Sequence, residues 1–599
     1  MHALTGVDRR RADAPAVLEK GSWVPRLWHI WLAASVPLSV MALPRVIHFA
    51  PSDPDDYMRL LQVRDWLAGQ SWFDVQQYRM NPPLGADMHW SRLVDLPIAA
   101  FLVVFRLFLA ERPAEIAAMT AVPICQLFVA MVVMRGLLQD LGAAAKTGLA
   151  AAALIPLFPL LTSNFLPMRI DHHGWQAVAA LACAWLMVRA GYRAAFAAGL
   201  VAAAWQTISL EGLPLAVVLA GLFALRYGLW GRREHEAFLG ALALGSIALF
   251  FATRAAGYIT TAHCDQLSWP HFVAFGAAAA LAAASRFLPG QTRATGRFAS
   301  LVPIGLAAGA AIVLPLGACA LDPFAGVDPV LRHYWLDNIV EGQPITRQLP
   351  SFAAMLLWTI ALLVLGALMA LQQAERPEQC KRWAFLALFA LAAAAMSLLV
   401  LRAALAAQLL AVPFAAVLLM HYLPRARALK RVVPRVAGTL ACIGLATPVI
   451  ATAAMKPFDR LSASAASSST VSATSSAGTC DLDRLNALPR SKLFAPLDLG
   501  PEILARTPHS VVMGPYHRNQ AKMREIFDVF AGPLGNARAI VQANGTSYLV
   551  ACTDQARLTV YADAGDDNLA DRLLAGRAPA WLEPVTGFER GPLRVFRVR

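Results

Sequence analysis

The chain has 599 residues, of which 58% are hydrophobic and 15% charged, and its mean hydropathy is +0.52. This composition excludes a soluble globular protein of that size and predicts a polytopic α-helical membrane protein. The formal charge of +14 raises the question of nucleic acid. A nucleic-acid partner is not expected, because the lysines and arginines lie in short loops between apolar runs, as they do in membrane proteins.

The first apolar run, residues 26–47, follows a polar and basic segment, residues 1–25, that is expected to stay in the cytoplasm. No small-residue cleavage site follows the run, so we interpret it as an uncleaved first span and not as a signal peptide. Apolar runs of about 20 residues, long enough to cross about 30 Å of hydrocarbon as helices, recur as far as Met455. They define a transmembrane domain over residues 26–457.

An acidic cluster opens the large first outer loop, residues 49–113. Asp53, Asp55 and Asp56 lie within four positions, and like charges this close repel one another unless a cation or a hydrogen-bond donor offsets them. Carboxylates at a membrane boundary indicate a functional site. The alternative is a solvated acidic turn that caps the helix starting near Tyr57.

Residues 96–109 are apolar but few, and they include Arg106. We therefore expect an interfacial or re-entrant helix within the first outer loop and not a further span. With this choice every later basic cluster falls on the cytoplasmic side. The sequence then predicts about thirteen spans, with the N-terminus inside and the C-terminus outside. The predicted spans include residues 114–134, 146–165 and 436–454.

A tract rich in Ser, Ala and Thr, residues 458–479, is expected to be a flexible linker. Residues 480–599 beyond it show the mixed pattern of a small extracytoplasmic α/β domain, which would be periplasmic in a Gram-negative cell. The predicted strands are residues 492–497, 510–513, 548–552, 558–562 and 593–598. The predicted helices are residues 500–506, 521–530 and 537–543.

The eight cysteines show neither a C-x-x-C pair nor the spacing of a zinc site. Cys480 and Cys552 fall in the outer domain, where a disulfide persists, and we expect them to pair. Five other cysteines lie in or beside apolar spans and are expected to be packing residues. These are Cys125, Cys183, Cys319, Cys380 and Cys442.

Three further polar features fall on the outer side. Asp171 and His173, at the tip of a span, can both reach one divalent cation, or their D-H-H triplet caps an interfacial helix. Glu341 lies in a turn before a proline and belongs either to a site or to an ordinary turn. Arg402 opens a span, where it either snorkels to the interface or holds a lipid phosphate.

Two of these stretches resemble motifs of the catalytic subunit of oligosaccharyltransferase, a GT-C membrane glycosyltransferase. Asp53-Pro54, followed by Tyr57 and Arg59, looks like the DPxxxxR stretch of its first outer loop. Asp171-His172-His173 matches the archaeal form of its second motif.

Two later stretches extend the resemblance. Residues 340–344, V-E-G-Q-P, are similar to the S-x-S-E-x-Q-P loop of that family. Arg402, with Leu410-Ala411-Val412-Pro413 after it, resembles the family's arginine-led span. Motif order, side and span number agree over residues 1–455.

The resemblance implies a donor on a polyprenyl phosphate or pyrophosphate and a divalent cation, Mg or Mn. The implied cation ligands are Asp53, Asp171, His173, Glu341 and, from the first outer loop, His89. Arg402 and Arg59 would contact the donor phosphate. Asp53 and Glu341 would be catalytic, and Asp55 or Asp56 could take the place of Asp53, since a shift of the alignment by one gap is invisible in a single sequence.

The chain departs from the family at one motif. The sequence WWDYG, which reads the Ser or Thr of an Asn sequon, is absent, and residues 514–519, G-P-Y-H-R-N, follow the predicted strand instead. Tyr516, His517, Arg518 and Asn519 either bind a polar acceptor or donor headgroup or form a hydrogen-bonded turn. The resemblance therefore does not extend to Asn-linked protein glycosylation.

The sequence thus predicts a glycosyltransferase of the inner membrane. With a divalent cation it would move a sugar or oligosaccharide from a lipid-linked donor to a protein or glycan acceptor on the outer face. One alternative is a transporter or flippase of lipid-linked saccharide with a cation-coupled carboxylate site, although no internal repeat is visible. Another is a non-enzymatic assembly protein for envelope polysaccharide, whose outer domain binds a partner.

Overall fold

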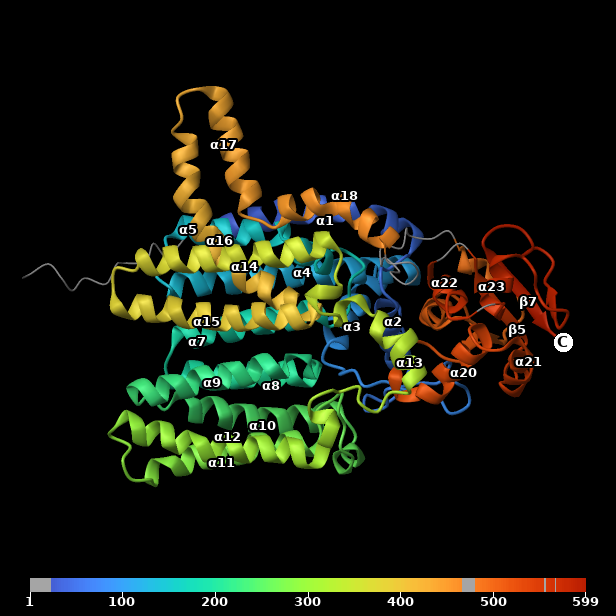
Figure 1. Ribbon diagram of the computed structural model, residues 1–599, viewed down its shortest axis with the longest axis horizontal. Helices are drawn as coiled ribbons and strands as arrows, with labels where there is room; N and C mark the ends of the chain where they lie inside the picture. Colours follow the sequence, from blue (N-terminus) through green and yellow to red (C-terminus); the bar gives the residue numbers. More distant parts are fainter. Residues whose placement is uncertain (1–22, 466–479, 554–555, 566) are drawn as a thin grey trace, which may run out of the picture.

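A bundle of long helices carries a smaller α/β domain at one of its ends (Figure 1). The computed structural model describes residues 23–465, 480–553, 556–565 and 567–599. Most of the predicted cytoplasmic segment, residues 1–22, and most of the predicted linker, residues 466–479, lie outside the described residues. Most of the long helices run roughly parallel, whereas α17 stands across them, and the loops at the end near the C-terminal domain are the longer ones (Figure 1).

Eight helices in the described ranges are long and apolar enough to cross a membrane, and a ninth span counts if the bent pair α17 (Val432–Leu445) and α18 (Val449–Ala465) is one. The eight are α1 (Trp23–His48), α4 (Glu111–Asp140), α9 (Leu213–Trp230), α10 (Glu234–Thr253), α12 (Ala294–Leu316), α14 (Pro350–Gln372), α15 (Pro377–Leu399) and α16 (Ala404–Arg427).

Four shorter helices pack inside the same bundle, against the long ones. They are α5 (Ala145–Leu154), α7 (His173–Arg189), α8 (Tyr192–Ile208) and α11 (Trp269–Ala284). The eight long helices, the bent pair counted once and these four make thirteen, which is compatible with the number of spans that the sequence predicts. The polytopic helical fold is therefore confirmed.

Two predicted spans are broken by prolines. The predicted span 146–165 consists of α5, a 3-10 turn (Ile155–Leu157) and α6 (Pro159–Asn164), because Pro156 and Pro159 remove two of the amide groups that a continuous helix needs. The predicted span 436–454 bends by 74° between α17 and α18. Pro448 lies at that break and disfavours helical backbone at Thr447.

The first loop, residues 49–113, folds around α2 (Pro54–Leu67) and α3 (Asp95–Arg106), with a small hairpin of β1 (Gln76–Gln77) and β2 (Ala86–Asp87) between them. Helix α3 has 12 residues, which makes it about 18 Å long. It is too short to cross a bilayer and belongs to the loop, in agreement with the interpretation of residues 96–109.

The C-terminal domain is built on a five-stranded sheet with the strand order β4-β3-β5-β7-β6. β3 is parallel to β4 and β5, whereas β7 is antiparallel to β5 and β6. The strands are β3 (Lys492–Phe494), β4 (Ser510–Val511), β5 (Tyr548–Cys552), β6 (Leu582–Pro584) and β7 (Leu593–Val598). The helices are α19 (Gly500–Arg506), α20 (Gln520–Phe530), α21 (Leu534–Ala543), α22 (Ala556–Ala562) and α23 (Leu569–Leu574).

Two expectations for this part of the chain were wrong. Residues 558–562 form a helix and not a strand: their β-branched and aromatic content favours a strand, but Leu558 and Tyr561, three positions apart, are both buried on one helical face. The expected linker begins too early at 458, because α18 continues to Ala465.

The first loop and the C-terminal domain share one hydrophobic core. The amide of Val511 donates to the carbonyl of Arg79, and the amide of Asn81 donates to the carbonyl of Val511, each at 2.9 Å, so that Met80 pairs with the edge strand β4. The Arg79 guanidinium donates to three carbonyls of the domain, among them that of Leu504 at 2.7 Å. The domain is therefore fixed to the loop that carries the acidic cluster.

Two disulfides are present in the described part of the chain. Cys480 is bonded to Cys552, the pair named from the sequence, and Cys264 is bonded to Cys319. The expectation that Cys319 is a packing residue was therefore wrong. It lies in the turn that follows α12, beyond the apolar run, where it meets the loop after α10.

Candidate active site

The acidic cluster of the first loop caps helix α2. Asp53 is the N-cap residue and has extended backbone, its Oδ1 accepts from the amide of Asp55 at 3.0 Å, and Pro54 occupies the first helical position. The helix cap of the alternative interpretation therefore exists, but the turn is not a solvated one, because Asp56 is fully buried. The cap aligns three carboxylates at the end of the bundle next to the C-terminal domain.

Arg169 gathers these carboxylates against the segment before α7. Its Nη1 lies 2.8 Å from Asp53 Oδ2 and 3.3 Å from Asp56 Oδ2, and its Nη2 lies 3.6 Å from Asp171 Oδ2. Asp56 Oδ1 also accepts from the amides of Ile170 and Asp171, at 2.8 and 3.0 Å. The acidic cluster and the D-H-H triplet are therefore neighbours in space.

Asp171 binds both histidines that follow it. Its Oδ1 contacts His172 Nδ1 and its Oδ2 contacts His173 Nδ1, and the two imidazole rings stack with centroids 4.3 Å apart. One ligand atom from each of the three residues lies within 4.8 Å of the other two. The three side chains are buried, and His173 Nε2 has no hydrogen-bond partner among the described residues.

A second group of charges completes the site on the other side of the histidines. Glu211 Oε2 lies 3.8 Å from His172 Nε2 and 3.9 Å from His173 Nε2. Arg402 bridges Glu211 and Glu341, and its Nε is buried with no hydrogen-bond partner in the described part of the chain. Contacts thus run without a gap from Asp53 to Glu341.

Burial and charge set the protonation of this group. Burial is the largest cause that raises the pKa of Asp56, to about 7, and it raises that of Asp55 well above its usual range, with the carboxylates of Asp53 and Asp171 adding to the effect. Burial would also raise the pKa of Asp171, but His172 and His173 hold it well below its usual range. The aspartates therefore differ in the ease with which they take a proton.

The C-terminal domain sends one side chain into the site. Tyr516 is buried, and its ring meets the edge of Trp90 with centroids 5.4 Å apart. Its buried hydroxyl faces the Asp55 carboxylate. Burial and the nearby Asp55 carboxylate raise the pKa of Tyr516 well above its usual range. The side chains of His517 and Arg518 instead contact Asp265.

Two residues of the expected site lie apart from this group. Arg59 is buried in an ion pair with Asp95 at 2.9 Å and stacks over the Trp90 ring. Its Nε and Nη2 have no hydrogen-bond partner among the described residues, so its predicted contact with a donor phosphate stays a prediction. His89 belongs to a different group of ligand atoms, with Asp265 and His517. Both residues sit in the first loop, where a sequence motif does not show which way a side chain points.

Arg169 and Glu211 were not named as site residues from the sequence. Arg169 stands two positions before Asp171, and Glu211 stands at the start of an apolar run. The signal that pointed to Asp53, a charge at a membrane boundary, applies to both. Their pairing with Asp53 and Arg402 depends on helix packing and could not be read from spacing.

The group holds the ligand types of a cation site. Its six carboxylates are Asp53, Asp55, Asp56, Asp171, Glu211 and Glu341, and its two guanidinium groups are Arg169 and Arg402. Carboxylate and imidazole ligands together suit a divalent metal. His173 Nε2, which has no hydrogen-bond partner among the described residues, lies 3.9 Å from Glu211 Oε2.

No protein-family model matches the chain, and no curated protein matches its sequence. Among solved structures, it is similar to the archaeal oligosaccharyltransferase AglB from Archaeoglobus fulgidus in complex with an inhibitory peptide and a dolichol-phosphate. The TM-score is 0.65 at 14% identity, over 94% of this chain and 72% of that one. The Archaeoglobus fulgidus oligosaccharyltransferase in complex with Zn and sulfate gives a TM-score of 0.62 at 14% identity, over 95% and 72% of the two chains.

The chain therefore shares the GT-C fold of these solved membrane structures. Within that fold it is similar to archaeal oligosaccharyltransferase, as the motif resemblance predicts.

Proposed function

We propose that the protein is a membrane glycosyltransferase that moves a sugar or oligosaccharide from a polyprenyl phosphate or pyrophosphate to an acceptor. The observation that carries the proposal is the unbroken set of contacts from Asp53 through Arg169, Asp171, His173, Glu211 and Arg402 to Glu341, at one end of an apolar bundle. A solved structure with this fold is a complex of archaeal oligosaccharyltransferase with an inhibitory peptide and a dolichol-phosphate.

Asp171, His172 and His173 would hold a divalent cation, Mg or Mn, with Asp53 and Glu341 close by. Bound there, the cation would supply positive charge next to the departing donor phosphate. Arg169 already touches Asp53, Asp56 and Asp171. It keeps these carboxylates together before the cation binds.

Arg402 is proposed to bind the donor phosphate, and Asp53 is proposed to act on the acceptor. The buried Nε of Arg402 has no hydrogen-bond partner among described residues, so Arg402 retains a donor for the phosphate while Glu211 and Glu341 orient its guanidinium. Asp53, whose pKa Arg169 lowers against the effect of burial, stays ionised and orients or deprotonates the attacking group of the acceptor.

The acceptor side is proposed to include Tyr516, because its buried hydroxyl reaches the Asp55 carboxylate of the acidic group. His517, Arg518 and Asn519 lie on the same turn, and the buried Nδ2 of Asn519 is unpartnered within the described ranges. The acceptor is proposed to be a protein or a glycan.

Orientation follows from charge. Basic clusters fall at one end of the bundle under the positive-inside rule, so the C-terminal domain is proposed to be periplasmic and the N-terminus cytoplasmic in an inner membrane. The lipid-linked donor would then meet the site at the outer leaflet.

The test is release of polyprenyl phosphate from a labelled donor by the full chain in vesicles. Asp53→Ala, Asp171→Ala and Glu341→Ala are each expected to abolish release while the protein still inserts and folds. The matched control Asp337→Ala, an exposed aspartate of the loop that carries Glu341, should keep the wild-type rate. Wild-type release by all three site variants would end the proposal. Movement of donor across the bilayer without bond cleavage would make the protein a flippase instead.

A further inference from the structure

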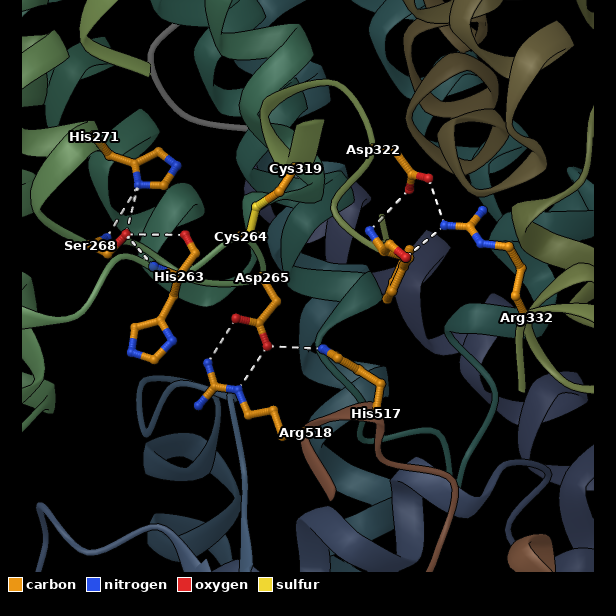
Figure 2. Close-up of a disulfide and its surroundings, with 11 residues drawn as sticks. His263, Cys264, Asp265, Ser268, His271, Cys319, Asp322, Arg332, His517 and Arg518 are labelled. Atoms are coloured by element: carbon orange, nitrogen blue, oxygen red, sulfur yellow. Dashed lines mark hydrogen bonds and ion pairs between the residues drawn. A yellow bond between two sulfur atoms is a disulfide. The ribbon is translucent and has the colours of Figure 1, made fainter. Parts of the chain in front are cut away.

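The turn that brings Tyr516 into the acidic group is held by its next two residues. Arg518 donates from Nε and Nη2 to the two carboxylate oxygens of Asp265, both at 2.8 Å, and His517 Nε2 lies 3.0 Å from Asp265 Oδ2 (Figure 2). Arg518 Nη1 also donates to Asp87 Oδ2 at 2.6 Å. Through these contacts Asp265, in the loop between α10 and α11, binds the C-terminal domain.

Asp265 is itself fixed at both sides along the chain. Its neighbour Cys264 is bonded to Cys319, which joins this loop to the turn after α12 (Figure 2). On the other side, the Ser268 hydroxyl accepts from the amide of His263 and donates to its carbonyl, at 3.0 and 3.1 Å, and Ser268 caps α11. The Asp265 carboxylate therefore projects from a closed turn with little freedom to move.

The segment beyond Cys319 returns to the same part of the C-terminal domain. The amide of Asp328 donates to Gln520 Oε1 at 2.8 Å, and Arg524 Nη1 lies 3.1 Å from Asp328 Oδ1. The disulfide thus links two loops that both hold the start of α20, one at Arg518 and one at Gln520. This closed set of contacts surrounds residues 516–520.

Tyr516 depends on this arrangement because two residues of chain, at most about 7 Å, separate it from Arg518. A shift of Arg518 is therefore passed on to the tyrosine hydroxyl. A displacement of about 1 Å at a reacting group can lower a rate by about 100-fold.

We propose that Asp265 is a positioning residue that, fixed by the Cys264–Cys319 disulfide, holds the Tyr516 hydroxyl in the acidic group, so that activity requires this disulfide. The claim that activity requires the disulfide rests on the proposed function. The claim that Asp265 and the disulfide fix the position of Tyr516 is independent of that function.

A bound metal is the other reading of the same residues. One ligand atom each of His89, Asp265 and His517 lies within 4.8 Å of the other two, a set that suits zinc. Arg518, however, already occupies both oxygens of Asp265 and brings a positive charge to the group. Like charges repel, so the ion pair is favoured over the metal.

The first experiment measures hydrogen exchange in the purified full chain. The double variant Cys264→Ser/Cys319→Ser and the variant Asp265→Asn are expected to raise exchange several-fold in residues 512–520, and Asp265→Glu to restore part of the protection. Asp337→Asn, which changes an exposed aspartate of the loop that carries Glu341, is the matched control and should leave these residues unchanged. Unchanged exchange in the disulfide and Asp265 variants would overturn the proposal. This result does not depend on any activity.

The second experiment is a double-mutant cycle on release of polyprenyl phosphate. Tyr516→Phe and Asp265→Asn are each expected to lower kcat by about 10- to 100-fold with little change in donor KM. Together they should cost no more than either alone, since Asp265 acts through Tyr516. Additive losses would overturn the positioning role, whereas absence of release by the wild type would overturn the proposed function and leave the exchange result standing.

The third experiment is a calorimetric titration with zinc alone. No site that depends on His89 and Asp265 is expected. Zinc binding that is lost in both His89→Ala and Asp265→Asn would overturn the ion-pair role in favour of a metal site.

Discussion

Arg169 allows three aspartates to share a small volume. Asp53, Asp56 and Asp171 come from two segments far apart in the sequence, and the guanidinium touches all three. Asp56 is fully buried, and one of its carboxylate oxygens accepts hydrogen bonds from two backbone amides. Asp56 therefore links the start of α2 to the segment before α7.

The buried Asp56 should make the folding stability of the protein depend on pH. Its folded pKa, about 7, lies above its usual value of 3.8, so ionising it costs stability. That cost is absent below about pH 3.8, grows as the pH rises and is complete above about pH 7. Asp56→Asn keeps an oxygen for the two amides and has no charge to bury. Its melting temperature should exceed that of the wild type by more at pH 8 than at pH 5, by a few degrees.

The control for this prediction is Ser52→Ala, an exposed residue just before the same helix that has no ionisable side chain. Its effect on the melting temperature should be the same at both pH values. A gain for Asp56→Asn that is equal at both pH values would contradict the assigned protonation.

Helix α13 (Pro329–Tyr334) shows how a short element is held by its first residue. Asp328 is the N-cap and accepts from the amides of Val330 and Leu331, at 2.9 and 3.2 Å. Burial alone would raise the pKa of Asp328, but those amides and Arg524 together hold it below its usual value. The cap therefore stabilises the helix fully above the usual carboxyl pKa of 3.8, and the stabilisation is lost as the pH falls through the lowered folded value.

Asp328→Ala should therefore lower the opening free energy of the α13 amides by about 1 kcal/mol at pH 6. The difference from the wild type should shrink at pH 3. Native-state hydrogen exchange, corrected for the intrinsic rate at each pH, measures both values. An equal difference at the two pH values would show that the carboxylate charge has no part in the cap.

Helices were read well from the sequence where composition alone decides them. The long apolar runs are spans because nothing else can bury them, and the short run at 96–109 is recognisable by its length. Residues 558–562 failed because a strand-like composition was overruled by packing on one face of α22. Pro448 is visible in the sequence and disfavours a straight helix, but the angle of the bend is set by tertiary contacts.

The candidate site was recovered in part for a similar reason. Asp53, Asp171, Glu341 and Arg402 stand in recognisable stretches, and the structure brings them into one set of contacts through Arg169 and Glu211. The direction of Arg59 depends on Asp95, 36 positions later. Pairings of that kind have no local pattern, so they could not be predicted.

At the scale of the molecule, the attachment of the C-terminal domain depends on Arg79. Its guanidinium donates to the carbonyls of Leu504, Thr507 and His509, and charge-assisted bonds to carbonyls that would otherwise be unpaired are strong. Arg79→Ala should raise hydrogen exchange in α19 and β4 several-fold and lower the melting temperature by several degrees.

The matched control for this prediction is Arg597→Ala, which removes an exposed arginine from β7 of the same domain. It should leave exchange and melting temperature at the wild-type values. If α19 and β4 exchange as slowly in Arg79→Ala as in the wild type, the shared apolar core alone fixes the domain.

The contact between the first loop and the C-terminal domain has a consequence for biosynthesis. Arg64 donates to the carbonyl of Ala505 across 441 positions of sequence. At about 5–20 residues per second, a ribosome needs roughly 20–90 s to deliver the second partner after the first. During that interval Met80 and its neighbours stand without the strand that covers them. Nascent chains stalled before codon 500 should therefore be cut by protease in the first loop, and chains released at full length should resist.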